Sequence, residues 1–168
     1  MDFRPKPLTV KNKLCIIKDR IDQQRQENSH LPVIYLPYSK GDKDIRIAVL
    51  DDNPTIGEML QQGLGLAGHT VVIYFSPTIL LADIIGPTTS STPFDLIIVD
   101  LFLPEGISGV EVIHQVWNTF PDLPVILISA ASSREIEAAR RAVPSVRVLR
   151  KPFSLTTLLA MIRELQNF

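Results

Sequence analysis

The sequence contains a single cysteine, Cys15, among 168 residues, so no disulfide can form within the chain. No hydrophobic run approaches the ~18 residues of a membrane span. The longest run near the N-terminus, Leu14–Ile17, is far shorter than the ~7–15-residue core of a signal peptide. A net charge of −1 provides no overall field for nucleic acid or an anionic membrane. These absences favour a cytoplasmic protein that contacts neither membrane nor nucleic acid.

The sequence does contain enough apolar residues to form a core, because 45% of it is hydrophobic and only 21% is charged. The charges are unevenly distributed. Residues 1–44 hold nine lysines and arginines against six acidic residues, whereas residues 45–168 hold eight against twelve. Between these regions, Ser39–Asp44 has the composition of a turn or linker. We therefore predict an N-terminal extension over 1–44 and one domain over 45–168.

The N-terminal extension carries one stripe of apolar residues at helical spacing: Val10, Leu14, Ile17 and Ile21. The stripe predicts an amphipathic helix over about residues 8–28. Two heptads are too few to specify a coiled coil, so two interpretations stay open. The helix either covers its own domain or pairs with a partner or a second copy. The next segment, His30–Tyr38, is apolar but contains two prolines, which predicts an edge strand or an extended tether.

From Ile45 onward, short runs rich in isoleucine and valine alternate with segments of helical period. Runs that are apolar on both faces are typical of parallel strands covered by helices on each side. The predicted strands are Ile45–Leu50, Thr70–Tyr74, Leu96–Val99, Val125–Ile128 and Val146–Leu149. The predicted helices include Ile56–Leu64, Ser76–Ile85, Ile113–Phe120, Ser132–Val143 and Leu155–Ile162. This alternation predicts an α/β fold, with a doubly wound five-stranded parallel sheet flanked by five helices.

Functional sites of such sheets lie beyond the carboxyl ends of the strands. The polar residues at those ends are Asp51, Asp52, Asp100, Ser129 and Lys151. Neighbouring carboxylates repel one another, and oxygen ligands at few positions favour Mg²⁺ as the cation that relieves the repulsion. A lysine and a hydroxyl beside such a metal suit the oxygens of a phosphoryl group. Taken singly, Asp52 or Ser129 could cap a helix and Lys151 could be a solvated charge. The presence of all five residues at one edge of the sheet therefore predicts a functional site there.

Residues 45–168 resemble the receiver domain of two-component response regulators, which implies a flavodoxin-like receiver fold. The resemblance covers about three quarters of the chain. It rests on the order and spacing of several motifs: Asp51-Asp52, Asp100, Leu103–Gly109, Ile128–Ala130 and Lys151–Phe153. No single motif would be specific, whereas the set in this order is.

The resemblance implies a role for each strand-end residue. Asp100 is expected to be the phospho-acceptor, and Ser129 and Lys151 are expected to contact the phosphoryl group. The expected Mg²⁺ ligands are Asp51, Asp52, Asp100 and the backbone carbonyl of Phe102. The donor would be a sensor histidine kinase or a histidine phosphotransfer protein, and the output would be a downstream partner protein. The chain would be a signalling domain that catalyses only its own phosphorylation and dephosphorylation.

The output surface departs from the family pattern at one position. Many receivers carry an aromatic switch residue three positions before the lysine, where this sequence has Val148. Coupling through a rotating ring is therefore not expected. Nearby, the predicted helix Ser132–Val143 and the strand region after it carry a dense set of charges: Arg134, Glu135, Glu137, Arg140, Arg141, Arg147 and Arg150. This set is either a solvated face or the interface of a homodimer held by ion pairs.

Two other functions fit parts of the sequence. Asp51–Thr55 resembles the nucleophile motif of haloacid dehalogenase-like phosphatases, but Asn53 stands where that motif needs a general-acid aspartate. A receiver-like interaction module that is never phosphorylated is the second alternative, and the complete set of site residues argues against it. The segment Gly63–Gly68 matches G-x-G-x-x-G, yet it closes a helix instead of following a strand. It is therefore not expected to bind a dinucleotide.

Overall fold

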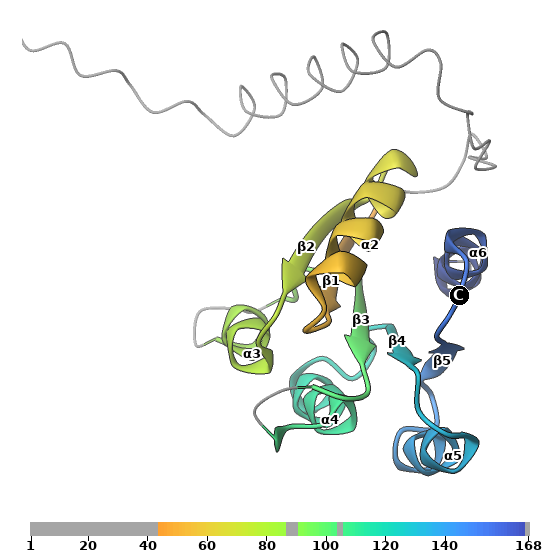
Figure 1. Cartoon of the computed structure of the whole chain (residues 1–168). Coiled ribbons are helices and arrows are strands. Elements are labelled where there is room, and N and C mark those ends of the chain that lie inside the picture. Colours follow the sequence, from red (N-terminus) through yellow and green to blue (C-terminus); the bar gives the residue numbers. More distant parts are fainter. Residues whose placement is uncertain (1–43, 87–90, 104–105, 167–168) are drawn as a thin grey trace, which may run out of the picture. The chain divides into compact units, whose positions relative to one another are not determined.

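The computed structural model describes residues 44–86, 91–103 and 106–166 (Figure 1). The amphipathic helix, the tether and most of the linker predicted for the N-terminal extension lie outside these residues, so they stay predictions. Within the described ranges, no helix is long and apolar enough to cross a membrane.

A five-stranded parallel sheet forms the centre of the domain, in the order β2-β1-β3-β4-β5. Its strands are β1 Arg46–Leu50, β2 Thr70–Tyr74, β3 Leu96–Asp100, β4 Val125–Ser129 and β5 Arg147–Arg150. The inner strands β1, β3 and β4 are buried almost throughout, since the helices cover both of their faces. The predicted strands are confirmed, with ends that differ by one residue at several places.

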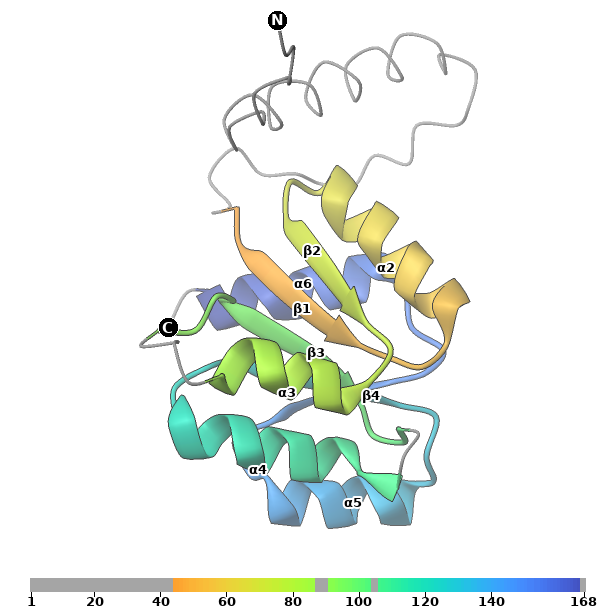
Figure 2. The same ribbon diagram turned by 90° about the vertical axis from the view of Figure 1, so that its left-hand side faces the viewer.

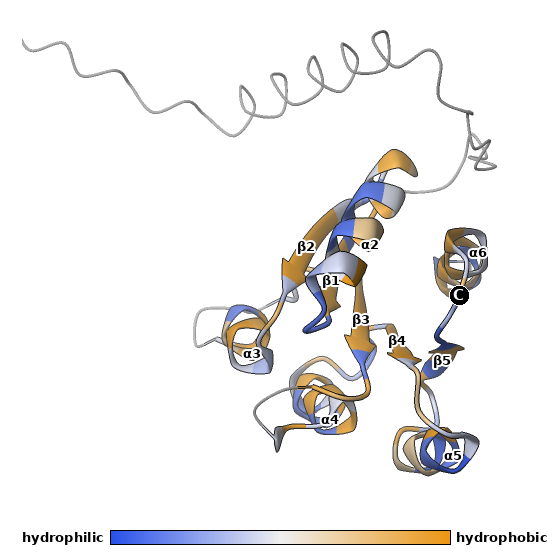
Figure 3. Ribbon diagram, viewed as in Figure 1, coloured by the Kyte–Doolittle hydropathy of each residue, from blue (hydrophilic) through white to orange (hydrophobic). Residues whose placement is uncertain are grey.

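Five helices cover the sheet in two layers (Figures 1 and 2). One face carries α2 (Pro54–Leu66) and α6 (Leu155–Gln166). The other face carries α3 (Pro77–Ile85), α4 (Gly109–Thr119) and α5 (Ser133–Ala142). Each layer packs its own apolar core against the sheet. Figure 3 shows hydrophobic strands and helices with one hydrophobic side. The doubly wound α/β fold is therefore confirmed.

Two helices begin at reciprocal caps that the local sequence encodes. In α5, the Ser132 hydroxyl accepts a hydrogen bond from the Glu135 N–H, and the Glu135 carboxylate accepts from the Ser132 N–H. Ser108 and Glu111 form the same capping box at the start of α4. These hydrogen bonds from the serines lower the pKa of Glu111 and of Glu135. Ser132, the first residue of the predicted segment Ser132–Val143, is thus the N-cap of α5, and α4 begins where the loop after β3 ends.

The glycine-rich segment at the end of α2 has a structural role. A Cβ atom at Gly63 would collide with the Leu155 side chain, so this glycine allows α6 to approach α2 closely. Gly68 has a φ of 96° directly after Ala67, the C-cap of α2. This left-handed conformation favours glycine at the end of a helix. The G-x-G-x-x-G match therefore closes a helix, as predicted.

Candidate functional site

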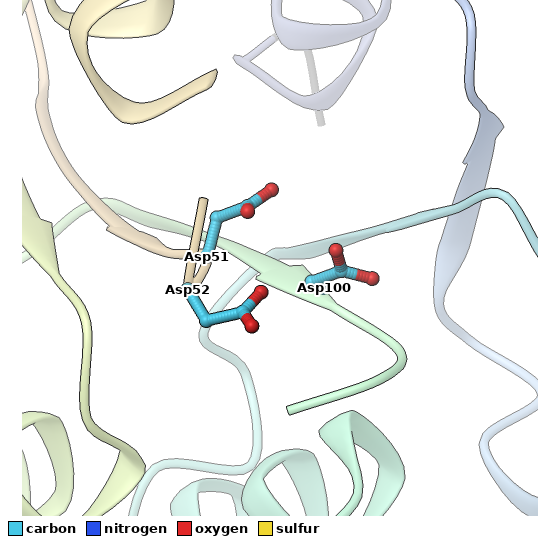
Figure 4. A group of neighbouring side chains, drawn as sticks. All are labelled: Asp51, Asp52 and Asp100. Carbon is cyan, nitrogen blue, oxygen red and sulfur yellow. The ribbon is translucent and has the colours of Figure 1, made fainter. Parts of the chain in front are cut away.

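Three carboxylates meet where β1 and β3 end. Asp51 and Asp52 directly follow β1, and Asp100 is the last residue of β3. One carboxylate oxygen from each residue lies within 4.8 Å of the others (Figure 4). Asp51 is fully buried and Asp100 is only 8% exposed, whereas Asp52 is exposed to solvent. The structure thus brings the three aspartates singled out from the sequence to one point, with one of them open to water.

Lys151 reaches the same point from the end of β5. Its Nζ donates hydrogen bonds to Asp51 Oδ2 at 2.7 Å and to Asp100 Oδ2 at 2.5 Å. Its backbone N–H donates to the Ser129 carbonyl at 2.8 Å, which ties the turn after β5 to the end of β4. The Lys151–Pro152 peptide bond is cis. One ammonium therefore bridges two carboxylates that lie 100 and 51 residues away along the chain.

Backbone groups fix the two buried carboxylates. Asp51 Oδ1 accepts from the Asn53 N–H at 2.9 Å, and Asp100 Oδ1 accepts from the Phe102 N–H at 3.2 Å. Each carboxylate thus uses one oxygen for the backbone and the other for Lys151. Gly109 completes the arrangement, because a Cβ atom there would collide with the Asp100 carbonyl oxygen. A glycine at this position lets α4 begin against the end of β3.

Asp52 is not the helix cap that its position in the sequence allowed. The cap of α2 is Asn53, whose side chain accepts from the Thr55 N–H at 3.0 Å. The interpretation of Asp52 as a cap is therefore wrong, and its carboxylate stays available at the aspartate cluster. Sequence reasoning missed the role of Asn53, although an asparagine before a proline is a good signal for a helix start.

Ser129 and Phe102 lie at the same edge of the sheet. Ser129 is buried at the end of β4, and its hydroxyl accepts from the Ala131 N–H at 2.9 Å. Asp100 pairs in register with Ile128, so Ser129 lies one residue beyond the neighbour of the aspartate. Phe102 is 55% exposed and forms an isolated antiparallel bridge with Ser108, which folds the loop after β3 back on itself. The structure places both residues beside the aspartates, while their contacts to a ligand stay predictions.

Val148 occupies the position where many receivers have an aromatic switch. It lies on β5, half-buried, in register with Leu127 of β4. Its side chain packs against the core that α3, α4 and α5 form on that face. A branched aliphatic side chain in this place fills core volume and has no ring to rotate.

Burial and charge oppose each other at the centre of the site. Burial raises the pKa of Asp100, and the hydrogen bonds from Lys151 and Phe102 offset only part of this effect. Burial alone would lower the pKa of Lys151, but its hydrogen bonds and charge interactions with Asp100 and Asp51 outweigh burial and raise it. The site thus stabilises the charged form of Lys151, whereas burial makes the ionised form of Asp100 less favourable than it is in water.

The donor set suits a divalent cation. Three carboxylates face one ammonium, so the cluster keeps an excess of negative charge when all four groups are ionised. Carboxylate oxygens are the ligands that Mg²⁺ prefers, and Mg²⁺ usually retains several waters. The exposed side of the cluster at Asp52 leaves room for such waters. The residues present therefore fit a magnesium ion.

Comparisons with known proteins agree with this architecture. The sequence profile of the response regulator receiver domain matches residues 47–163. The response regulator MprA of Mycobacterium ulcerans is 32% identical over 121 residues, which cover 72% of this chain and 50% of that protein. The chain thus spans about half the length of the curated relatives it matches.

Solved structures share the fold. The chemotaxis protein CheY4 of Vibrio cholerae superposes with a TM-score of 0.63 at 25% identity, over 73% of this chain and 99% of that one. The response regulator DrrB, a Thermotoga maritima OmpR/PhoB homolog, superposes with a TM-score of 0.63 at 25% identity. That match covers 74% of this chain and 54% of DrrB. With its profile match, its relatives and this fold, the chain belongs to the response regulator receiver domain family of two-component signalling.

Proposed function

We propose that Asp100 accepts a phosphoryl group from the phosphohistidine of a sensor histidine kinase or a histidine phosphotransfer protein. One observation carries the proposal: the Lys151 ammonium bridges Asp51 and Asp100 beside the exposed Asp52. A structural ion pair alone would need one carboxylate, whereas this cluster gathers three. The surplus of carboxylates makes sense where a cation and a phosphoryl group are to be held.

Mg²⁺ is the proposed cofactor. Asp51, Asp52, Asp100 and the backbone carbonyl of Phe102 would hold it, and the bound ion would neutralise negative charge on the phosphoryl oxygens. Lys151 adds the second positive charge, because its Nζ already lies 2.5 Å from Asp100 Oδ2. Lys151 would thus share with the bound ion the task of offsetting negative charge at Asp100.

In the proposed transfer, an Asp100 carboxylate oxygen forms a bond to phosphorus as the N–P bond of the phosphohistidine breaks. The electron pair of the N–P bond stays on the imidazole nitrogen. The Lys151 ammonium keeps its proton and pairs with a phosphoryl oxygen, and the Ser129 hydroxyl donates a hydrogen bond to another. The product is a mixed anhydride that water can hydrolyse, so the chain returns to its starting state.

The mixed anhydride would act as a switch. It adds negative charge and acceptor oxygens where Lys151 and Ser129 now bond to Asp100 and Ala131. A shift of these two partners would bias the surface next to β4 and β5 and change the binding of a downstream partner protein. Val148 would take part by packing alone. We propose that this signalling takes place in the cytoplasm, without direct contact to nucleic acid or membrane.

The test is phosphorylation by a small acyl phosphate. The protein is incubated with Mg²⁺ and acetyl phosphate, and its intact mass is recorded for the wild type, Asp100→Asn and the control Asp122→Asn. We expect one phosphoryl adduct in the wild type and in the control. The adduct is expected to be absent from Asp100→Asn and after addition of EDTA.

Two results would argue for the alternatives. An adduct that persists in Asp100→Asn but is lost in Asp51→Asn would favour a phosphatase-like nucleophile. No adduct with acetyl phosphate or with phosphorylated donor proteins would favour a receiver-like module that binds partners without phosphorylation.

A further inference from the structure

The loop between β4 and α5 connects the candidate site to the start of a helix. It covers residues 130–132, between Ser129 at the end of β4 and the first residue of α5. Ser129 pairs in register with Arg150, the last residue of β5. The next residue, Lys151, reaches the aspartate cluster with its ammonium. The β4–α5 loop and the end of β5 therefore lie side by side at the carboxyl edge of the sheet (Figure 1).

Arg150 holds this loop with two separate hydrogen bonds. Its Nη2 donates to the Ala131 carbonyl at 3.3 Å, and its Nη1 donates to the Ser133 hydroxyl at 3.1 Å. Ala131 is the middle residue of the loop, and Ser133 is the first residue of α5. A guanidinium can serve two acceptors at once because its donors form a planar fork. One side chain of β5 thus fixes both the loop and the start of the helix.

Ala131 links this guanidinium to the Ser129 hydroxyl. Ala131 is buried, and its N–H donates to Ser129 Oγ at 2.9 Å. A hydroxyl that accepts one hydrogen bond still has its own proton to donate. The bond from Ala131 therefore fixes the Ser129 oxygen and leaves its proton for another acceptor. Because Arg150 holds the carbonyl of the same residue, it restrains the group that orients Ser129.

Stabilisation of α5 alone does not account for an arginine at this position. The N-terminus of a helix carries a partial positive charge, so a cation beside it is unfavourable. The Arg150 guanidinium nevertheless lies within hydrogen-bond distance of Ser133, the first residue of α5. The helix already begins at a complete capping box formed by Ser132 and Glu135. The benefit of Arg150 therefore lies in the loop that it holds.

We propose that Arg150 is a positioning residue for phosphoryl transfer, which holds the β4–α5 loop so that Ser129 can donate its proton to the phosphoryl group. The inference rests on the proposed function, in which Ser129 forms that hydrogen bond. Arg150 contacts Ala131 and Ser133, and it acts on the reaction only through Ser129. Without the guanidinium, the Ala131 carbonyl turns to water and the orientation of the Ser129 hydroxyl is less restricted. The transition state is then less well stabilised.

The first test measures the initial rate at which acetyl phosphate and Mg²⁺ phosphorylate the full chain, from intact masses over time. Arg147→Met is the matched control, because it removes another exposed arginine of β5. Urea denaturation verifies that each variant is folded at the assay temperature. We expect Arg150→Met to react about three- to tenfold more slowly than the wild type and Arg147→Met to stay within about twofold of it. Equal rates of Arg150→Met and the wild type overturn the proposal.

Two further variants separate positioning from a simple effect of charge or folding. Arg150→Lys keeps the charge but loses the fork, so its rate should stay within about twofold of that of Arg150→Met. Ser129→Ala removes the hydroxyl through which Arg150 acts, so Arg150→Met should have no further effect in that background. A lysine variant with the wild-type rate, or an effect of Arg150→Met that is equally large without the Ser129 hydroxyl, overturns the proposal.

The second measurement follows the loop in the unphosphorylated protein and needs no reaction. NMR records how fast the Ala131 amide exchanges with D₂O, since this N–H is the donor to Ser129. Loss of the guanidinium should raise this exchange rate by about three- to tenfold in Arg150→Met and leave it within about twofold of the wild type in Arg147→Met. An unchanged rate in Arg150→Met shows that the guanidinium does not hold the loop, and overturns the proposal.

The outcomes separate this inference from the proposed function. A wild type that gains no adduct, or an adduct that persists in Asp100→Asn, contradicts the proposed function and this inference with it. A wild type that is phosphorylated on Asp100 at a rate independent of Arg150 overturns the inference alone.

Discussion

The interior of the sheet and its carboxyl edge follow opposite rules, and β3 contains both within five residues. Leu96–Val99 are apolar and buried, so they stabilise the fold by leaving water. Asp100 is nearly as buried, yet it carries a charge that burial disfavours. A position that only stabilised the fold would hold another apolar residue. The difference therefore supports the carboxyl edge as the proposed functional region of the domain.

The same contrast appears in how each region is held together. Interior residues need only close packing, to which many neighbouring side chains contribute. The aspartates at the edge depend on a few specific partners, namely the Lys151 ammonium and the backbone N–H groups of Asn53 and Phe102. Loss of a partner at the carboxyl edge should therefore leave a buried charge uncompensated. Truncation of a side chain in the interior should instead leave a cavity.

The largest effect on stability is expected in the interior. Ile126→Ala truncates a fully buried side chain of β4 and should lower the free energy of unfolding by about 2–5 kcal/mol. Urea denaturation measures this loss. The folded fraction should still be phosphorylated by acetyl phosphate, because Ile126 lies away from the aspartates. A folded variant that cannot be phosphorylated would show that the interior and the carboxyl edge are not independent of each other.

Loss of the lysine is expected to act through charge. Lys151→Met leaves Asp51 and Asp100 facing each other without a cation, and should lower the free energy of unfolding by about 3 kcal/mol in EDTA. Arg147→Met, which removes an exposed charge from β5, the strand directly before Lys151, should change the free energy of unfolding by less than about 0.5 kcal/mol. Equal effects of the two substitutions would show that the ammonium does not hold the carboxylates.

Magnesium should stabilise the folded state through the same cluster. Binding to the native protein alone adds about 1.4 kcal/mol at a Mg²⁺ concentration ten times the dissociation constant. Thermal unfolding should shift upward with Mg²⁺ and return to its starting point with EDTA. Asp52→Asn should weaken this response, and Asp122→Asn should leave it intact. A wild type that shows no shift up to high Mg²⁺ concentrations would argue against the metal site.

The smallest effect concerns the pH dependence of stability without metal. Burial raises the pKa of Asp100 above its ordinary value of 3.8, so the folded state binds the proton more tightly than the unfolded state does. The contribution of Asp100 to stability is therefore fully present below pH 3.8 and is lost as the pH rises through the raised pKa. In EDTA, the free energy of unfolding of Asp100→Asn should therefore increase relative to that of the wild type as the pH rises through this range. A relative loss of stability over the same range would reverse the assigned sign.

Much of the fold was predictable because each element carries a local signal. Short runs such as Val125–Ile128 are apolar on both faces, as strands between two helical layers must be. The segment Ser132–Val143 also opens with serines suited to capping, and Ser132 is the N-cap of α5. The strand ends shifted by a residue because hydrogen bonding between strands, which no local pattern records, sets them.

The site was predictable as a set of residues and less so as a geometry. The rule that strand ends meet at one edge brought Asp51, Asp100 and Lys151 together. The choice of Asn53 over Asp52 as the cap of α2 was missed, although the position of Asn53 directly before a proline could have indicated it. The bridging of two carboxylates by Lys151 depends on contacts across 51 and 100 residues, which a single sequence does not specify.

The measurement that tests the central claim most directly is to locate the phosphorylated residue. The protein is treated with acetyl phosphate and Mg²⁺, the acyl phosphate is reduced with borohydride, and peptides are sequenced by mass spectrometry. Reduction of an aspartyl phosphate leaves homoserine at the acceptor position. We expect homoserine at position 100 and nowhere else, and none without Mg²⁺. Homoserine at position 51 or 52, with Asp100 unmodified, would contradict the account.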